Sequence, residues 1–171
     1  WWKLDRNLDI PAVRASGAAM ALDYLQNGVT TILDHHASGE IKGSLEALQD
    51  AIVGDAGMRA AFCFETSDRF DVSACVSENL AFAKAAVPGR SAALFGLHAS
   101  MSLSVDTLSL VSEAKGDLPV HVHAATAAKA GLQQGHHNGP GLHHYDPARG
   151  MQWRSPEKCQ PTTTTWQHHT L

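Results

Sequence analysis

The stretch that decides the fold spans residues 27–36 and reads Asn27-Gly28-Val29-Thr30-Thr31-Ile32-Leu33-Asp34-His35-His36. Asn27-Gly28 is predicted to end a helix, because glycine tolerates the left-handed conformation that a helix C-cap requires. The β-branched run over 29–33 predicts a short buried strand. A polar loop is predicted to follow from Asp34 to Gly39, so ionisable side chains are expected directly after the strand.

The same order of helix, turn and strand recurs on both sides of this stretch. A helix is predicted to begin at Asp9 with Pro11 in its first turn. Further helices are predicted over 44–55, 73–86 and 104–115, and further strands over 60–65, 91–97 and 118–123. Strands that alternate with helices through short turns predict parallel β/α units with right-handed crossovers. The sequence therefore indicates an α/β fold.

Polar side chains gather at the ends of the predicted strands. Asp34 to His36, Glu65, His98 and His123 all stand at or just after a strand end. The carboxyl ends of parallel strands share one edge of a sheet, which is where α/β proteins place their sites. We therefore expect a functional site at this edge.

His121 and His123 lie two residues apart in a predicted strand, so their side chains share one face. Neutral imidazoles in this position are suited to binding a metal ion, and the alternative is a hydrogen-bonded histidine pair without metal. His98 is a candidate for orienting a substrate or a proton, or else a strand-end histidine bonded to a backbone carbonyl.

The remaining candidates are open to two interpretations. One group of candidates could hold a metal-binding histidine in one tautomer by hydrogen bonding to it: Asp34, His35 and His36. Adjacent side chains of a strand point apart, so we do not expect His35 and His36 to bind the same metal ion. The segment 65–69, with Glu65, Asp68 and Arg69, indicates either a site cluster or a structural ion pair. Cys63 is expected in the core rather than as a nucleophile.

Composition narrows the functional classes. The chain has 171 residues and a net charge of −4. A sequence pI near 6.2 and the lack of a basic stripe argue against nucleic-acid binding. No apolar run approaches the roughly 18–20 residues of a membrane helix. The N-terminal stretch lacks the order of a signal peptide. Three cysteines without paired spacing favour reduced thiols, so we expect a cytoplasmic protein.

The segment 127–171 differs from the rest of the chain. It is rich in Gly, Pro, His, Gln and Thr and has no sustained apolar period, so we predict an irregular or disordered tail. We accordingly divide the chain into an α/β domain over 1–126 and this tail. A shifted reading frame or a truncated gene model after about Ala125 is one hypothesis for the change. The histidine pairs of the tail are not expected to form a dedicated metal site.

Five motifs, taken in order, resemble those of one enzyme family. They are Trp1-Trp2-Lys3-Leu4-Asp5, Gly28-Val29-Thr30-Thr31 with Asp34-His35-His36-Ala37-Ser38, Glu65-Thr66-Ser67-Asp68-Arg69, Gly96-Leu97-His98-Ala99-Ser100 and His121-Val122-His123-Ala124-Ala125. The ordered set resembles the amidohydrolase superfamily, in its ATZ/TRZ chlorohydrolase and guanine-deaminase-like branch, over about residues 1–126.

The resemblance implies a metal-dependent (β/α)8 barrel that hydrolyses C–N bonds of heterocyclic amines by means of metal-activated water. It implies zinc or iron as the cofactor and His123 as a metal ligand, with His121 beside it on the same face. It also implies that His98 positions the substrate and that Asp34 and His36 belong to the segment that lines the barrel mouth. The expected partner is a small molecule.

Departures from the family pattern limit the expected activity. The first-strand ligand pair of the family would precede Trp1, and Thr126 stands where the family has a glutamate that carries a proton. Residues 1–126 provide about four β/α units, whereas a whole barrel needs about 200–250 residues. We therefore expect a partial barrel that is incomplete as a catalyst. The alternative is a non-catalytic half-barrel subunit that self-associates.

Overall fold

The computed structural model describes residues 2–123, 145–146 and 150–151. The chain divides into two units, Trp1–His123 and Ala124–Leu171. In the second unit, the described residues form the antiparallel pair β6 (Tyr145–Asp146) and β7 (Gly150–Met151). The remainder of the predicted tail, including its histidine pairs, and Thr126 lie outside the described residues. No helix in the described part is both long and apolar enough to cross a membrane.

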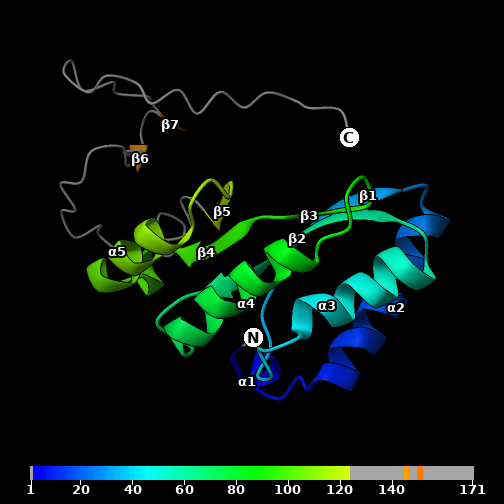
Figure 1. Cartoon of the computed structure of the whole chain (residues 1–171), viewed down its shortest axis with the longest axis horizontal. Helices are drawn as coiled ribbons and strands as arrows, with labels where there is room; N and C mark the ends of the chain where they lie inside the picture. The colour runs from blue at the N-terminus through cyan, green and yellow to red at the C-terminus, as the bar shows by residue number, and fades with distance from the viewer. Residues whose placement is uncertain (1, 124–144, 147–149, 152–171) are drawn as a thin grey trace. The chain divides into compact units, whose positions relative to one another are not determined.

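The first unit alternates helices with strands (Figure 1). Its helices are α1 (Trp2–Asp5), α2 (Ile10–Gln26), α3 (Ser44–Gln49), α4 (Val72–Ala85) and α5 (Val105–Ala114), with a π-helical turn η1 (Asp50–Asp55) after α3 and a 3₁₀ turn η2 (Ser100–Ser102) before α5. Its strands are β1 (Thr31–His36), β2 (Arg59–Thr66), β3 (Ser91–Ala93), β4 (Phe95–Ala99) and β5 (Val120–His123).

Side-chain caps begin the longer helices at the residues that local chemistry favours. The Asp9 carboxylate accepts a hydrogen bond of 2.8 Å from the Ala12 amide, as predicted for the start of α2. Asp71 caps α4 and Ser104 caps α5 in the same way. The start of α3 is capped from a distance, because the buried Glu78 of α4 accepts from the amides of Gly43 and Leu45.

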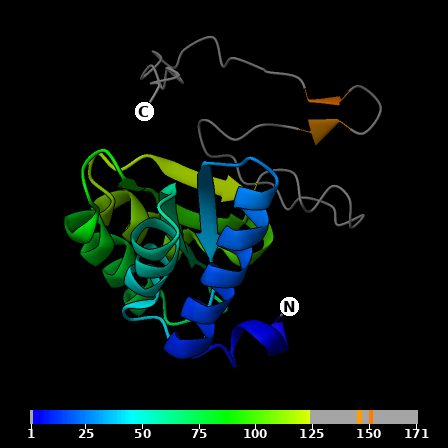
Figure 2. The same ribbon diagram turned by 90° about the vertical axis from the view of Figure 1, so that its right-hand side faces the viewer.

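The strands form one parallel sheet in the order β1-β2-β4-β5, with β3 also paired to β2. The sheet curls into a half-barrel, and Figures 1 and 2 show α2, α3 and α4 together on one of its faces. The α/β prediction is therefore confirmed at the level of a curled parallel sheet with four strand positions and helices on its convex side.

Two of the predicted strands differ from the observed ones. The first was expected over 29–33, but β1 runs from Thr31 to His36, because its whole length pairs with β2 up to His36 beside Phe64. The single strand expected over 91–97 is broken at Leu94 into β3 and β4. Long-range pairing decides both differences, and local sequence does not report it.

The break in the third strand position is filled by a helix side chain. Asn79 of α4 is fully buried; its amide oxygen accepts from the Phe64 amide at 2.9 Å, and its amide nitrogen donates to the Phe64 carbonyl at 3.0 Å. Gly96 passes close by, since a Cβ there would lie 2.3 Å from the Phe64 carbonyl oxygen. The backbone of β2 at Phe64 therefore packs closely against both Asn79 of α4 and Gly96 of β4.

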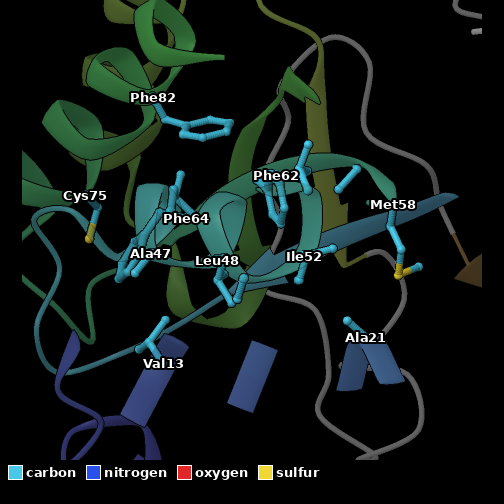
Figure 3. Packing of buried hydrophobic residues seen from close by; sticks show 14 residues of the cluster. Val13, Ala21, Ala47, Leu48, Ile52, Met58, Phe62, Phe64, Cys75 and Phe82 are labelled. Atoms are coloured by element: carbon cyan, nitrogen blue, oxygen red, sulfur yellow. The ribbon is translucent and has the colours of Figure 1, made fainter. Parts of the chain in front are cut away.

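The main core lies between the sheet and α2, α3 and α4 (Figure 3). Its largest members include Leu45, Ile52, Phe62, Phe64 and Phe82, all of them fully buried. Each such side chain contributes about 1.5–3 kcal/mol by leaving water. A smaller cluster of Val76, Phe95 and Val111 joins α4 and α5 to β4. These clusters hold the helices on the convex side of the sheet.

Candidate functional site

Strand alternation assigns the concave side chains of β1 and β2. Ile32 packs against the main core, and Phe62 and Phe64 belong to it, so all three face the helices. Side chains of opposite parity face the other way. His35, Cys63 and Glu65 therefore lie on the concave face, and the 3.5 Å contact between the Cys63 sulfur and His35 Nδ1 agrees with this placement.

The same rule assigns the concave side chains of β4 and β5. Phe95 belongs to the smaller core cluster, and Leu97 and Val120 pack against it. His121 and His123 therefore lie on the concave face with His35. His98 lies at a shift in register between Leu97 and Ala99, and its ring contact with His123, with centroids 5.6 Å apart, places it on the same face. The prediction that His121 and His123 share one face agrees with this placement, and the strands carry four histidines to one place.

Three of these histidines form a cluster from which a metal ion could be bound. Each of His35, His121 and His123 offers one nitrogen, and the three atoms lie within 4.8 Å of one another. The Nδ1 atoms of His35 and His121 are 2.8 Å apart, so one ring donates a hydrogen bond and the other accepts it. The rings of His35 and His123 meet edge to face, with centroids 4.4 Å apart.

Burial favours the neutral form of His35 and His121. It lowers the pKa of His35 to about 3, assisted by repulsion from His123 and His121. Burial also lowers the pKa of His121, again with repulsion from His123. A neutral imidazole has the free lone pair that a metal ligand needs. His35 Nε2 is buried and has no hydrogen-bond partner among the described residues, so the donor set fits a metal ion.

Next to the cluster, Glu65 and Arg69 form a buried ion pair. Arg69 donates to both carboxylate oxygens of Glu65 at 2.7 Å, and Ser67 donates to the same carboxylate at 2.7 Å. Asp5 lies 3.5 Å from the Arg69 guanidinium. Asp68 is not part of this pair, because it accepts from the Ser104 amide at the start of α5. The segment 65–69 therefore contains a structural ion pair that also borders the site.

His98 connects this ion pair with the histidine cluster. Its ring centroid is 5.6 Å from that of His123, and its Nε2 lies 3.8 Å from a Glu65 oxygen. The Ser102 hydroxyl donates to the Ala99 carbonyl at 2.9 Å, so it accepts from His98 Nδ1 at 2.6 Å. The proton of neutral His98 is thereby held on Nδ1, and the lone pair on Nε2 is available.

A pocket of about 460 Å³ adjoins His98. It is lined by Trp2, Asp68, Arg69, His98, Met101 and Ser102. The Arg6 guanidinium lies 4.5 Å from the centroid of the Trp2 ring and stacks on it. The pocket thus combines an aromatic wall with a histidine that can exchange a proton.

The other two candidates, Asp34 and His36, do not join this cluster. Their position in β1 puts them on the convex face, where His36 packs edge to face on Phe64 with ring centroids 5.8 Å apart. Burial raises the pKa of Asp34 to about 6 and lowers that of His36 to about 4. The structure therefore separates these two from His98, His121 and His123.

Sequence reasoning passed over His35 as a metal ligand. The rule that adjacent histidines point apart holds for His35 and His36, but it did not indicate which of them faces the site. Parity counted from the partly buried Ile32, which packs against the core, selects His35, provided that the strand is extended to residue 36. Cys63, expected in the core, is fully buried, and burial raises the pKa of its thiol to about 12.

No protein-family model matches the sequence. The resemblance to amidohydrolases therefore stays a prediction from the five sequence motifs.

Proposed function

We propose that the chain forms the metal-binding part of a hydrolase of the amidohydrolase type, with its sheet as part of a (β/α)8 barrel. The observation that carries this proposal is the set of three histidine nitrogens within 4.8 Å of one another. They lie at the C-terminal ends of β1 and β5, the position at which barrel enzymes build their active sites.

Each concave side chain has a role in this proposal. His121 and His123, together with His35, would hold zinc or iron, both of which suit imidazole ligands. Such an ion lowers the pKa of a bound water and so provides a nucleophile at neutral pH. Three protein ligands are the number that catalytic zinc sites use while they leave one position open.

His98 would serve the substrate. Its Nε2 lone pair, fixed by the contact of Nδ1 with Ser102, can take up a proton beside the Glu65 carboxylate. The pocket that it lines with Trp2 and Met101 can accept a flat heterocyclic amine, because the Trp2 ring offers a face for stacking. Substrate and proton carrier would thus lie next to the metal ligands.

An activated ester gives the most direct test, because 4-nitrophenolate leaves without a proton donor. We expect the zinc-loaded chain to hydrolyse 4-nitrophenyl acetate faster than the zinc-free chain, and His123→Ala to abolish the difference. His36→Ala is the matched control, since His36 faces away from the cluster, and it should keep the zinc-dependent rate. Equal rates in His123→Ala and the unaltered chain would refute the proposal. We expect no ammonia release from guanine, cytosine or aminotriazines.

Self-association is a second candidate function, favoured by one observation. Leu33 is 68% exposed and lies on the concave face with His35. In addition, β1 and β5 each pair on one side only within the described residues. Unpaired edges and exposed apolar surface favour association with another copy. Light scattering over a range of concentrations should then show a defined dimer, and a monomer throughout would contradict this candidate.

A further inference from the structure

The histidine cluster bridges the two ends of the sheet. In the strand order, β1 and β5 are the outermost positions, with β2 and β4 between them. Neighbouring strands are about 4.8 Å apart, so a flat sheet would hold β1 and β5 about 14 Å from each other. The Nδ1 atoms of His35 and His121 are nevertheless only 2.8 Å apart. Curvature of the sheet therefore brings side chains from opposite ends into contact.

Within the described residues, this contact joins the two ends weakly when no metal is bound. One hydrogen bond links the three rings, between His35 and His121, and His35 Nε2 has no described partner. His123 is exposed and contributes ring contacts. A buried nitrogen without a hydrogen-bond partner destabilises the fold, so closing the sheet in this way is unfavourable unless another group satisfies the cluster.

We propose that one zinc-class divalent ion, bound by His35, His121 and His123, cross-links β1 to β5 and holds the sheet in its curled form. His35 is the essential member, because it is the ligand from the far end of the sheet. His121 and His123 come from the same strand and could not join the ends by themselves. This role concerns folding, so it goes beyond the hydrolytic function proposed above and does not require turnover.

Metal binding and stability are coupled in this proposal. An ion that binds the curled sheet and not the unfolded chain stabilises the fold by mass action, and the midpoint of thermal unfolding rises with the concentration of free zinc. Zinc should also slow amide exchange in β1 and β5, because both strands are then tied to each other. An ion held only by side chains of one strand would also raise the midpoint if it bound the folded chain alone, but it would not tie β1 to β5 and slow amide exchange in both.

The test compares the full chain with the single variants His35→Ala, His36→Ala and His123→Ala. Each protein is freed of metal and titrated with zinc. Calorimetry then gives the midpoint of thermal unfolding, and amide exchange is measured for β1 and β5. We expect the unaltered chain and His36→Ala to gain stability with zinc. His35→Ala should bind the ion at least about 100-fold more weakly, since even the loss of an outer-shell partner costs 10–100-fold, and should lose the gain. His123→Ala should also lose the zinc-dependent gain in stability. Because His123 is exposed, this variant replaces His35→Ala in the test if His35→Ala does not fold.

Two results would overturn the proposal. One is a zinc-dependent rise of the unfolding midpoint in His35→Ala equal to that of the unaltered chain, which would place the stabilising ion elsewhere, for example on histidines of the segment 127–171. The other is stoichiometric binding that leaves the midpoint and the exchange of β1 and β5 unchanged. Ester hydrolysis distinguishes the two proposals: zinc-dependent stabilisation without hydrolysis refutes the hydrolase alone, and zinc-dependent hydrolysis without any stabilisation of the fold refutes the cross-link alone.

Discussion

The buried carboxylate of Glu65 provides a quantitative test of the polar network on the concave face. Its side chain is 5% exposed and neutralises Arg69, which is 18% exposed. Glu65→Gln keeps the shape and removes the charge, which leaves Arg69 with Asp5 at 3.5 Å as its remaining described acidic neighbour. Breaking a buried ion pair costs about 3–5 kcal/mol. Because Arg69 keeps Asp5 as a neighbour and some contact with water, we expect Glu65→Gln to lower the free energy of unfolding by about 3 kcal/mol, at the lower end of this range.

The assay is urea unfolding followed by circular dichroism, with thermal unfolding beside it. A loss of about 3 kcal/mol corresponds to a fall of about 12 °C in the unfolding midpoint for a unit of this size. Asp55→Asn is the matched control, because its ion pair with Arg14 is exposed on both sides and should be worth less than about 1 kcal/mol. Equal losses in the two variants would refute the assigned role of Glu65.

The same substitution should also change the titration of His98. The Glu65 charge raises the pKa of His98 and partly offsets the larger effect of burial, which lowers it. Removing the charge should therefore lower the pKa of His98 further. An NMR titration measures this pKa, and the signal that is missing in the His98→Asn variant identifies the His98 resonance. A rise in the pKa would show that Glu65 does not face His98 in solution.

Two further predictions concern close packing and pH. Gly96→Ala should cost about 3 kcal/mol of stability in urea unfolding, because the new Cβ would lie 2.3 Å from the Phe64 carbonyl oxygen. Gly54→Ala should cost nothing measurable, because its Cβ would lie 3.9 Å from the Gln49 carbonyl oxygen, which is ordinary contact. The metal-free chain should lose stability as the pH falls from about 6.5 toward 4, because the pKa values of His35 and His36 are lowered in the fold and the unfolded chain binds more protons. The raised pKa of Asp34 acts in the opposite direction, because the folded chain then takes up a proton as the pH falls, but it is one group against the two histidines. Urea midpoints at pH 7 and pH 5 measure the balance, and greater stability at pH 5 would contradict it.

The alternation of helices and strands could be predicted from local signals. Asp9 marked the start of α2 because its carboxylate caps an amide three residues on, and Asn27-Gly28 marked the end because Gly28 adopts a positive φ. Period-two spacing likewise put His121 and His123 on one face. These features depend on residues close in the chain, which a single sequence reports directly.

The composition of the cluster could not be predicted in the same way. His35 became a candidate ligand because β2 extends β1 to residue 36, and because the sheet curls until β1 reaches β5. Both effects depend on pairing between segments more than 25 residues apart in sequence. The convex position of Asp34 and His36 follows from the same strand extension, so one shifted strand boundary accounts for all three placements.

The side chain of Asn79 joins α4 to the backbone of β2. It occupies the hydrogen-bonding positions at Phe64 where the third strand is interrupted, so the bend of the sheet is anchored to a helix on its opposite side. Shortening this side chain would leave the Phe64 amide and carbonyl without these partners, so the loss of Asn79 would weaken the sheet as well as its contact with the helix.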